Sequence, residues 1–175
     1  MPKSSQKQIR EDELKVIQEL QKNSNANIDD IAKKCGFSRQ KVWRIIKRLE
    51  ENKTIWGYSA IADIEKQDLT EYTVLIKRTN LPLTEKLADN IIVRKIEDLL
   101  PSTRMKIENS YYVHGKYDWI IIFTAENIKQ AKKFCETLNN IYQGYIEELH
   151  LIETMFTIKK QGILNPEAGK LKEFL

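Results

Sequence analysis

The sequence predicts an α+β protein in which a winged-type helix-turn-helix domain is joined by a hinge strand to a ferredoxin-like βαββαβ domain. Hydrophobic residues repeat three times at helical spacing in the first 52 residues, whereas the strand patterns of the second domain, rich in β-branched and aromatic residues, begin after residue 71. The charge of the chain also divides between these two parts. We expect the two domains at residues 1–62 and 72–160, a linker at 63–71 and a C-terminal tail at 161–175.

The net charge of +4 over 175 residues is unevenly distributed. Residues 1–60 contain 13 Lys and Arg against 8 Asp and Glu, while residues 61–175 have a balance of −1. This asymmetry favours an anionic partner, such as a nucleic acid, for the N-terminal part.

Composition also excludes several classes of protein. The longest apolar run, Trp119–Phe123, is far shorter than the ~20 residues of a membrane-spanning helix, and the polar N-terminus leads into no signal segment. The two cysteines, Cys35 and Cys135, are too few and too far apart for a disulfide framework or a metal site. We therefore expect buried thiols and a soluble cytoplasmic protein that has no membrane partner, no metal and no cofactor.

Three helices are expected in the first domain. The first covers about Glu11 to Lys22, and the second follows Asn27, which is a favourable N-cap residue. Gly36 ends the second helix, as a residue with positive φ would. The third helix begins at Ser38 and continues to about Asn52.

The third helix has a basic surface. Five cations and no acid lie between Ser38 and Arg48, and two of them, Arg39 and Lys41, occupy the first turn. The helix dipole disfavours positive charge there by about 0.3–1 kcal/mol per residue. When a sequence breaks such a local preference without a compensating charge, the reason is often functional. Phosphate groups bound at the N-terminus of this helix would explain the two cations there. The alternative is a solvated basic face with no partner.

A short helix, a glycine-containing turn and a basic second helix form the helix-turn-helix arrangement. Ala32, Gly36, Val42 and Ile45 match its small residue, turn glycine and two core aliphatics. We therefore predict DNA binding through Ser38, Arg39, Gln40, Lys41, Trp43, Arg44, Lys47 and Arg48.

The chemistry of these side chains suggests separate roles. Arg suits guanine and Gln suits adenine, so bases are assigned to Arg39, Gln40 and Arg44. Phosphates are assigned to the three cations Lys41, Lys47 and Arg48. Trp43 either packs on the following segment or contacts a sugar or thymine methyl group.

The segment Thr54–Asp63 follows the third helix. Ile55, Tyr58 and Ile61 fit a strand or hinge arm, and Gly57 marks a bend. This arm either pairs with a second copy of the chain or packs on its own domain as a wing.

The second domain alternates strands and helices. Strands are expected at Tyr72–Ile76, Met105–Val113, Trp119–Phe123 and Tyr145–Ile158. One helix follows Thr84 and is closed by Pro101, and the other covers about Asn127 to Tyr142. Helices then cover only one face of the sheet, which favours burial of the other face against a second chain.

The turn His114–Asp118 contains polar groups and a glycine at a sheet edge. These groups would suit a small zwitterionic ligand. The alternative is a hairpin in which Asp118 and Gly115 serve only the turn.

The chain resembles the Lrp/AsnC (feast/famine) family of transcription regulators, over about Glu11 to Ile158. The most specific stretches are Val42–Glu51 continuing into Ile55–Tyr58, and Gly115–Asp118. The segment Thr79–Ser110 is longer than usual for the family and the tail is additional.

The resemblance implies a C-terminal domain of the RAM/AsnC type that forms homodimers, often assembled into tetramers or octamers. It also implies sequence-specific binding to pseudo-palindromic promoter DNA and, in many members, an amino-acid effector between dimers. The effector-binding residues that it suggests here are His114, Gly115, Tyr117, Asp118 and Thr154.

Two other functions are weighed against a specific regulator. An architectural, sequence-tolerant DNA-binding protein would share the basic helix, but it would not need Gln40 and Arg44 to face outward together. Some relatives of this fold are sirohaem decarboxylases, which use His and Arg residues of the sheet domain. Here the only histidines are His114 and His150, and the sequence shows no pattern of a nucleophile with its base. An enzyme has no need for five cations on one helix, so we expect no enzymatic activity.

Overall fold

The computed structural model describes residues 5–92, 96, 100 and 104–175, and it divides into two compact units. The first comprises Met1–Ile61 and Ile158–Pro166, and the second Ala62–Thr157 and Glu167–Leu175. No helix in the described part of the chain is long and apolar enough to cross a membrane.

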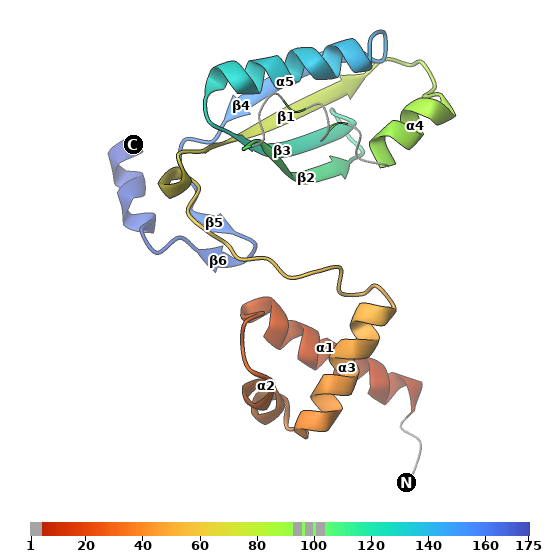
Figure 1. The fold of residues 1–175 in the computed structure, drawn as a ribbon, viewed down its shortest axis with the longest axis vertical. Helices are drawn as coiled ribbons and strands as arrows, with labels where there is room; N and C mark the ends of the chain where they lie inside the picture. The colour runs from red at the N-terminus through yellow and green to blue at the C-terminus, as the bar shows by residue number, and fades with distance from the viewer. Residues whose placement is uncertain (1–4, 93–95, 97–99, 101–103) are drawn as a thin grey trace. The chain divides into compact units, whose positions relative to one another are not determined.

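The first unit contains the three helices labelled α1, α2 and α3 in Figure 1, and each begins after a polar N-cap residue. They are α1 (Gln6–Lys22), α2 (Ile28–Cys35) and α3 (Arg39–Glu51). The side chains of Ser5, Asn27 and Ser38 accept hydrogen bonds from backbone N–H groups in the following turn. The cap at Ser5 explains why α1 begins five residues earlier than predicted.

The core of the first unit is made by the apolar faces of all three helices. Val42, Ile45 and Leu49 of α3 are buried, as their spacing predicted, and Ala32 of α2 packs with them. The remaining buried members of this cluster are Val16, Leu20 and Ile31. Packing against α1 and α2 therefore uses one face of α3 and leaves its opposite face to solvent.

The expected hinge strand is not formed within one chain. No strand occurs in residues 52–69, all of which the structure describes. The N–H groups of Thr54 and Ile55 donate to the Leu49 carbonyl, and beyond them the chain is extended, with Trp56 96% exposed. A strand needs a partner to satisfy its backbone groups, and this segment has none among the described residues. A short hairpin, β5 (Lys159–Lys160) with β6 (Ile163–Leu164), belongs to the same unit.

The second unit contains a four-stranded antiparallel sheet in the order β2-β3-β1-β4 (Figure 1). In chain order its elements are β1 (Thr70–Arg78), α4 (Glu85–Ile92), β2 (Lys106–Tyr112), β3 (Trp119–Ala125), α5 (Ile128–Ile141) and β4 (Ile146–Glu153). The predicted βαββαβ order is confirmed. The last strand ends at Glu153 rather than Ile158, and Phe156 instead packs against Phe174 of the short 3-10 segment η3 (Ala168–Phe174). The helix that follows Thr84 was predicted to end at Pro101, and this residue lies outside the described residues.

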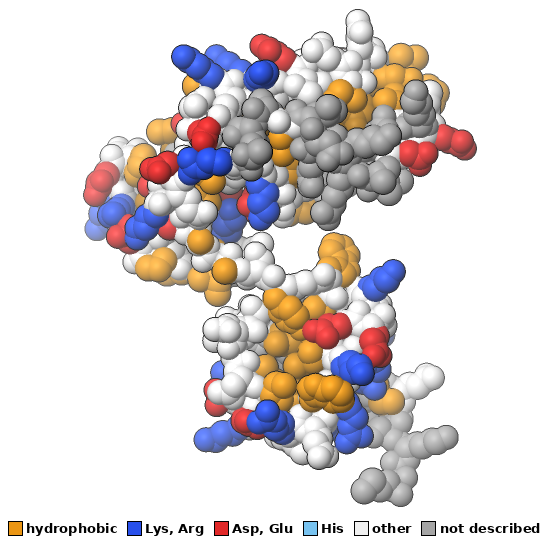
Figure 2. Space-filling view, viewed as in Figure 1, with side chains coloured by type: hydrophobic (Ala, Val, Ile, Leu, Met, Phe, Trp, Pro, Cys, Tyr) orange, Lys and Arg blue, Asp and Glu red, His pale blue; other side chains and the backbone are white. Residues whose placement is uncertain are grey.

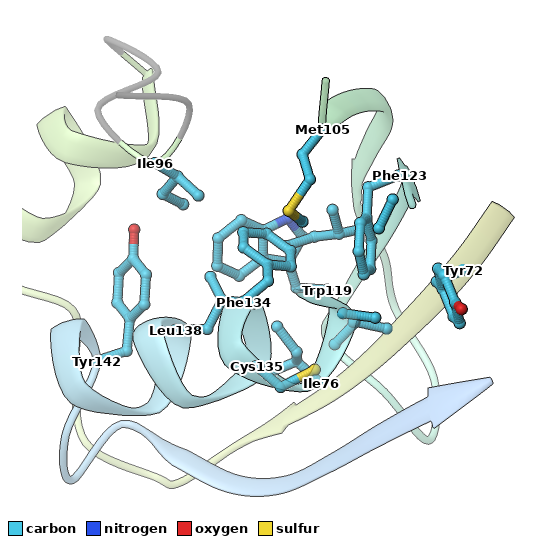
Figure 3. Packing of buried hydrophobic residues seen from close by; sticks show 14 residues of the cluster. Tyr72, Ile76, Ile96, Met105, Trp119, Phe123, Phe134, Cys135, Leu138 and Tyr142 are labelled. Carbon is cyan, nitrogen blue, oxygen red and sulfur yellow. The ribbon is translucent and has the colours of Figure 1, made fainter. Parts of the chain in front are cut away.

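The helix α5 covers one face of this sheet (Figure 3). Phe134 lies 4.7 Å from Phe123, measured between ring centroids, and Leu138 is fully buried beside them. Burial raises the pKa of the Cys135 thiol to about 11. Cys35 is only half-buried, so the prediction of two buried thiols is correct for one of them.

The other face of the sheet carries the residues that alternate with the core. In β1 these are Thr73, Leu75 and Lys77, which are all half-buried in the single chain. The register places Leu75 between Ile120 of β3 and His150 of β4. This face is therefore apolar along its middle and polar at one side.

Candidate nucleic-acid interface

The turn between α2 and α3 has the geometry of a helix-turn-helix. Gly36 adopts a left-handed conformation with φ +71°, and the N–H of Phe37 donates to the Ala32 carbonyl at 2.8 Å. The Ser38 hydroxyl then accepts from the N–H of Lys41 at 3.3 Å and caps α3. Ser38, one of the predicted DNA-contacting residues, therefore uses its hydroxyl to cap α3 in the free protein.

The exposed face of α3 carries four of the predicted contacts. They are Gln40, Trp43, Arg44 and Lys47. The Nε of Arg44 donates weakly to the Gln40 carbonyl at 3.4 Å, and no carboxylate in the described residues pairs with its guanidinium. The amino group of Lys47 lies 5.3 Å from the Trp43 ring centroid, and its distance to Glu51 is 3.8 Å. These side chains are available to a ligand.

Two further cations of α3 form ion pairs with acids from the other helices. Arg39 lies 2.6 Å from a carboxylate oxygen of Asp29 in the first turn of α2, and both side chains are well exposed. Arg48 lies 2.8 Å from Glu13 of α1. Exposed pairs of this kind contribute about 0.2–1 kcal/mol, so either cation can leave its partner at small cost.

Lys41 has the strongest intramolecular attachment. Its amino group lies 2.6 Å from a carboxylate oxygen of Asp12, which is 7% exposed, and 3.9 Å from the centroid of the Phe37 ring. Gln8 donates to the other oxygen of Asp12 at 3.1 Å. Burial alone would raise the pKa of Asp12, but the hydrogen bonds from Lys41 and Gln8 outweigh it and leave this pKa lowered.

The prediction that the first-turn cations of α3 are uncompensated is therefore wrong. Asp29 neutralises Arg39 and Asp12 neutralises Lys41. Figure 2 shows basic and acidic side chains next to one another on this unit. Sequence reasoning missed Asp12, Glu13 and Asp29 because it counted charges within one helix, whereas the compensation comes from the neighbouring helices.

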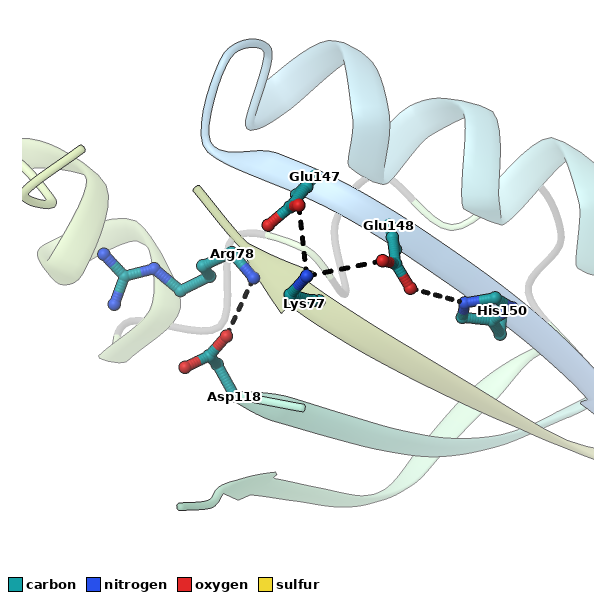
Figure 4. Close-up of polar contacts among 6 residues, drawn as sticks. All are labelled: Lys77, Arg78, Asp118, Glu147, Glu148 and His150. Carbon is teal, nitrogen blue, oxygen red and sulfur yellow. Dashed lines mark hydrogen bonds and ion pairs between the residues drawn. The ribbon is translucent and has the colours of Figure 1, made fainter. Parts of the chain in front are cut away.

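The predicted effector residues of the β2–β3 hairpin divide into two that contact neighbouring strands and two that are exposed. A carboxylate oxygen of Asp118 accepts from the N–H of Arg78 at 2.8 Å (Figure 4), and the N–H of Asp118 donates to the Ile76 carbonyl. Tyr117 packs edge-on against His150, with ring centroids 5.8 Å apart. His114 and Gly115 are exposed at the tip of the hairpin.

Thr154 does not join these residues within one chain. Its N–H donates to the carbonyl of Glu71 near the start of β1, whereas Asp118 bonds to Arg78 at the end of that strand. Seven residues separate Glu71 from Arg78, which corresponds to about 23 Å along a strand. A site that uses both Thr154 and Asp118 would need more than one protomer.

A polar cluster joins β1 and β4 on the face of the sheet opposite α5. Lys77 lies 3.1 Å from Glu147 and 3.4 Å from Glu148, and Glu148 lies 3.1 Å from His150 (Figure 4). The hydrogen bonds from His150 and Lys77 lower the pKa of Glu148. Among the described residues no group of three His, Cys, Asp or Glu side chains could hold a metal ion.

The comparisons with known proteins agree with this geometry. Residues 13–55 match the family model described as a winged helix-turn-helix that binds DNA. The leucine-responsive regulatory protein of Haemophilus influenzae is 24% identical, over 78% of this chain and 78% of its own. The structure of an AsnC family transcriptional regulator from Agrobacterium tumefaciens has a TM-score of 0.62 at 20% identity, over 89% of this chain and 96% of that one. The chain thus has the fold of the Lrp/AsnC transcriptional regulators, and its sequence is similar to helix-turn-helix transcriptional regulators over most of its length.

Another solved Lrp/AsnC relative contains a bound ligand. It is the feast or famine regulatory protein of M. tuberculosis in complex with L-methionine, with a TM-score of 0.68 at 15% identity, over 87% of this chain and 95% of that one. At this identity the likeness concerns the fold of the two proteins. It therefore supports the Lrp/AsnC architecture.

Proposed function

We propose that this Lrp/AsnC regulator recognises specific duplex DNA by placing the N-terminal half of α3 in the major groove. The observation that carries the proposal is that Gln40 and Arg44 are exposed together, one helical turn apart, on the face opposite the core residues Val42 and Ile45. Gln pairs with adenine and Arg with guanine through two hydrogen bonds each, so both residues are suited to reading bases.

The ion pairs refine the roles of the other cations. Lys47 has only a distant, exposed partner and is proposed to contact phosphate. Arg39 is proposed to leave the exposed carboxylate of Asp29 for a base, and Arg48 to leave the half-buried carboxylate of Glu13 for a phosphate. Lys41 is proposed chiefly to position α3 against α1 rather than to bind DNA, because its carboxylate partner is buried. Trp43 is proposed to contact a sugar or a thymine methyl group.

The regulator is proposed to act as a homodimer or a larger oligomer. The apolar middle of the uncovered sheet face, with Leu75, Ile120 and Ile122, supports burial against a second copy. Two copies of α3 would then read the two halves of a pseudo-palindromic promoter site, about one helical turn apart or a multiple of it. Nothing in the site calls for enzymatic activity, and the relatives named above are transcriptional regulators.

A small effector, such as an amino acid, is proposed to bind between protomers at the β2–β3 hairpin. His114, Gly115 and Tyr117 are accessible there, and L-methionine is bound by one relative. Thr154 would come from another protomer, because it lies at the opposite end of β1 from Asp118. Such a ligand would act by favouring one assembly over another.

The test is a titration against a labelled duplex from upstream of the protein's own gene, with a scrambled duplex as reference, at several salt concentrations. We expect a preference of about 1000-fold or more and a steep loss of affinity with salt. The substitution Arg44→Ala should cost about 1–3 kcal/mol and relax specificity at one base position. The matched substitution Lys47→Ala should weaken all sequences alike.

The same titration separates the alternatives. Tight binding without preference for either duplex would favour an architectural protein. Equal effects of Arg44→Ala and Lys47→Ala on the two duplexes would overturn the assignment of bases to Arg44. Absence of binding at low salt would refute the proposed use of α3 altogether.

A further inference from the structure

A cavity of about 200 Å³ lies in the second unit, at the end of β1 and on the side of the sheet that faces α5. Its wall is mainly aliphatic and aromatic, with contributions from Ile76, Leu83, Tyr112, Trp119, Tyr145 and Ile146. The indole N–H of Trp119 already donates to the Ser110 hydroxyl at 2.8 Å, so it is not available to a ligand. Besides Ser110 and the hydroxyls of Tyr112 and Tyr145, the polar side chains of the wall are those of Arg78 and Tyr142.

Both of these side chains have a buried polar atom without a hydrogen-bond partner among the described residues. Tyr142 is 2% exposed and its hydroxyl is unpaired. In Figure 3 its oxygen points away from α5, toward Ile96. The Nε of Arg78 is also buried and unpaired, although its Nη1 donates to the Tyr112 hydroxyl and its Nη2 to the Leu81 carbonyl.

Such groups are costly and need an explanation. A buried donor without an acceptor is destabilising, and most buried polar groups in native proteins are paired. No described carboxylate pairs with the Arg78 guanidinium: the nearby acid, Asp118, accepts from the Arg78 backbone N–H. Burial raises the pKa of Tyr142 to about 12, so its hydroxyl remains protonated and can donate. The two residues that carry these donors, Arg78 and Tyr142, thus both line one largely apolar cavity.

We propose that this cavity binds a small apolar monocarboxylate, whose oxygens accept from Nε of Arg78 and the hydroxyl of Tyr142. The hydrocarbon part would contact Ile76, Leu83 and Trp119. A water occupies about 30 Å³ of liquid, so the cavity has the volume of about six or seven waters and suits a ligand of comparable size.

The lining also defines the ligand class. No acidic side chain is among the described residues of the wall, so the ammonium group of an amino acid would have no anionic partner there. A 2-oxo acid or a short aliphatic acid fits better. None of His114, Gly115, Tyr117, Asp118 and Thr154 lines the cavity, so this site is distinct from the hairpin proposed above. The inference does not depend on the proposed DNA contacts.

The test is calorimetric titration of the full chain, without DNA, with 4-methyl-2-oxopentanoate and with L-leucine, which has the same carbon skeleton but an ammonium group. We expect the oxo acid to bind at least about 10-fold more tightly, because the ammonium group of L-leucine would lose its water without gaining an anionic partner. Tyr142→Phe should weaken oxo-acid binding about 10-fold or more without loss of fold, since it removes only the unpaired hydroxyl. Arg78→Gln should weaken it further.

The matched control is Tyr111→Phe, because the Tyr111 hydroxyl donates to Asn109 and its ring lies on the opposite side of β2 from the cavity-lining Tyr112. This variant should bind the oxo acid as the unmodified protein does. The proposal is overturned if the unmodified protein binds no oxo acid at millimolar concentration, if L-leucine binds as tightly, or if Tyr142→Phe and Tyr111→Phe behave alike.

Discussion

The buried ion pair between Asp12 and Lys41 makes a quantitative prediction for Asp12→Asn. The substitution keeps the shape of the side chain but removes the charge that Lys41 contacts at 2.6 Å. A hydrogen bond to a charged group contributes about 1.5–3 kcal/mol when buried. Because the Lys41 side chain is 43% exposed and partly screened by solvent, we expect a loss of about 1–2 kcal/mol from the stability of the first unit.

Hydrogen exchange of the α3 amides measures this loss in the full chain. A destabilisation of this size increases the open population about 5- to 30-fold, and exchange of the Val42 and Ile45 amides should accelerate accordingly. The matched control is Glu13→Gln, which removes the more exposed pair with Arg48 and should cost less than about 1 kcal/mol. Unchanged exchange in Asp12→Asn, or equal acceleration in both variants, would refute the role assigned to the buried pair.

The pH dependence of the same measurement gives an internal check. The pKa of Asp12 in the folded protein lies below its ordinary value of 3.8. A lowered pKa stabilises the folded state fully above about pH 5, and this stabilisation disappears as the pH falls through the lowered pKa. The difference in exchange between the unmodified protein and Asp12→Asn should therefore be constant near neutral pH and should vanish in strong acid.

Three further predictions concern other parts of the chain. Gly36→Ala should destabilise the first unit by about 1–2 kcal/mol in thermal unfolding, because φ is +71° there, whereas Gly57→Ala, without a positive φ, should have little effect. Leu75→Asp should shift the protein toward a monomer in analytical ultracentrifugation if the uncovered sheet face forms the dimer; an unchanged mass would exclude that face. With a thiol reagent at pH 8, half-buried Cys35 should react in the native protein, and Cys135 only after unfolding, because its pKa is about 11.

The elements of this fold were predictable where one local rule decides the outcome. Spacing alone identified the buried residues Val42, Ile45 and Leu49 of α3, and the turn glycine Gly36. The order of strands and helices in the second unit likewise followed from the change of hydrophobic period. Helix starts and strand ends were less accurate: the early start of α1 depends on one hydroxyl, that of Ser5.

Features that depend on tertiary partners were not predictable in the same way. The segment around Trp56 and Tyr58 has the composition of a strand, yet it has no strand partner among the described residues. The cavity beside Tyr142 brings together residues of all four strands and of the turns that follow β1 and α5. No spacing rule within one segment predicts that these residues line a common cavity. The unpaired atoms of Arg78 and Tyr142 can be recognised only in the three-dimensional structure.

The ion pairs of α3 also change how its cations should contribute to DNA affinity. A cation that leaves an internal carboxylate for a phosphate exchanges one ion pair for another, so its net gain is small. Arg44 has no carboxylate to leave among the described residues, and Lys47 only a distant one. Counterion release gives a salt slope of about 0.9 per neutralised phosphate, which is about 2.7 if Lys41, Lys47 and Arg48 all neutralise phosphates but about 0.9 if Lys47 alone does. A salt slope per protomer nearer the smaller value would show that carboxylates of α1 and α2 remain paired with cations of the recognition helix when DNA is bound.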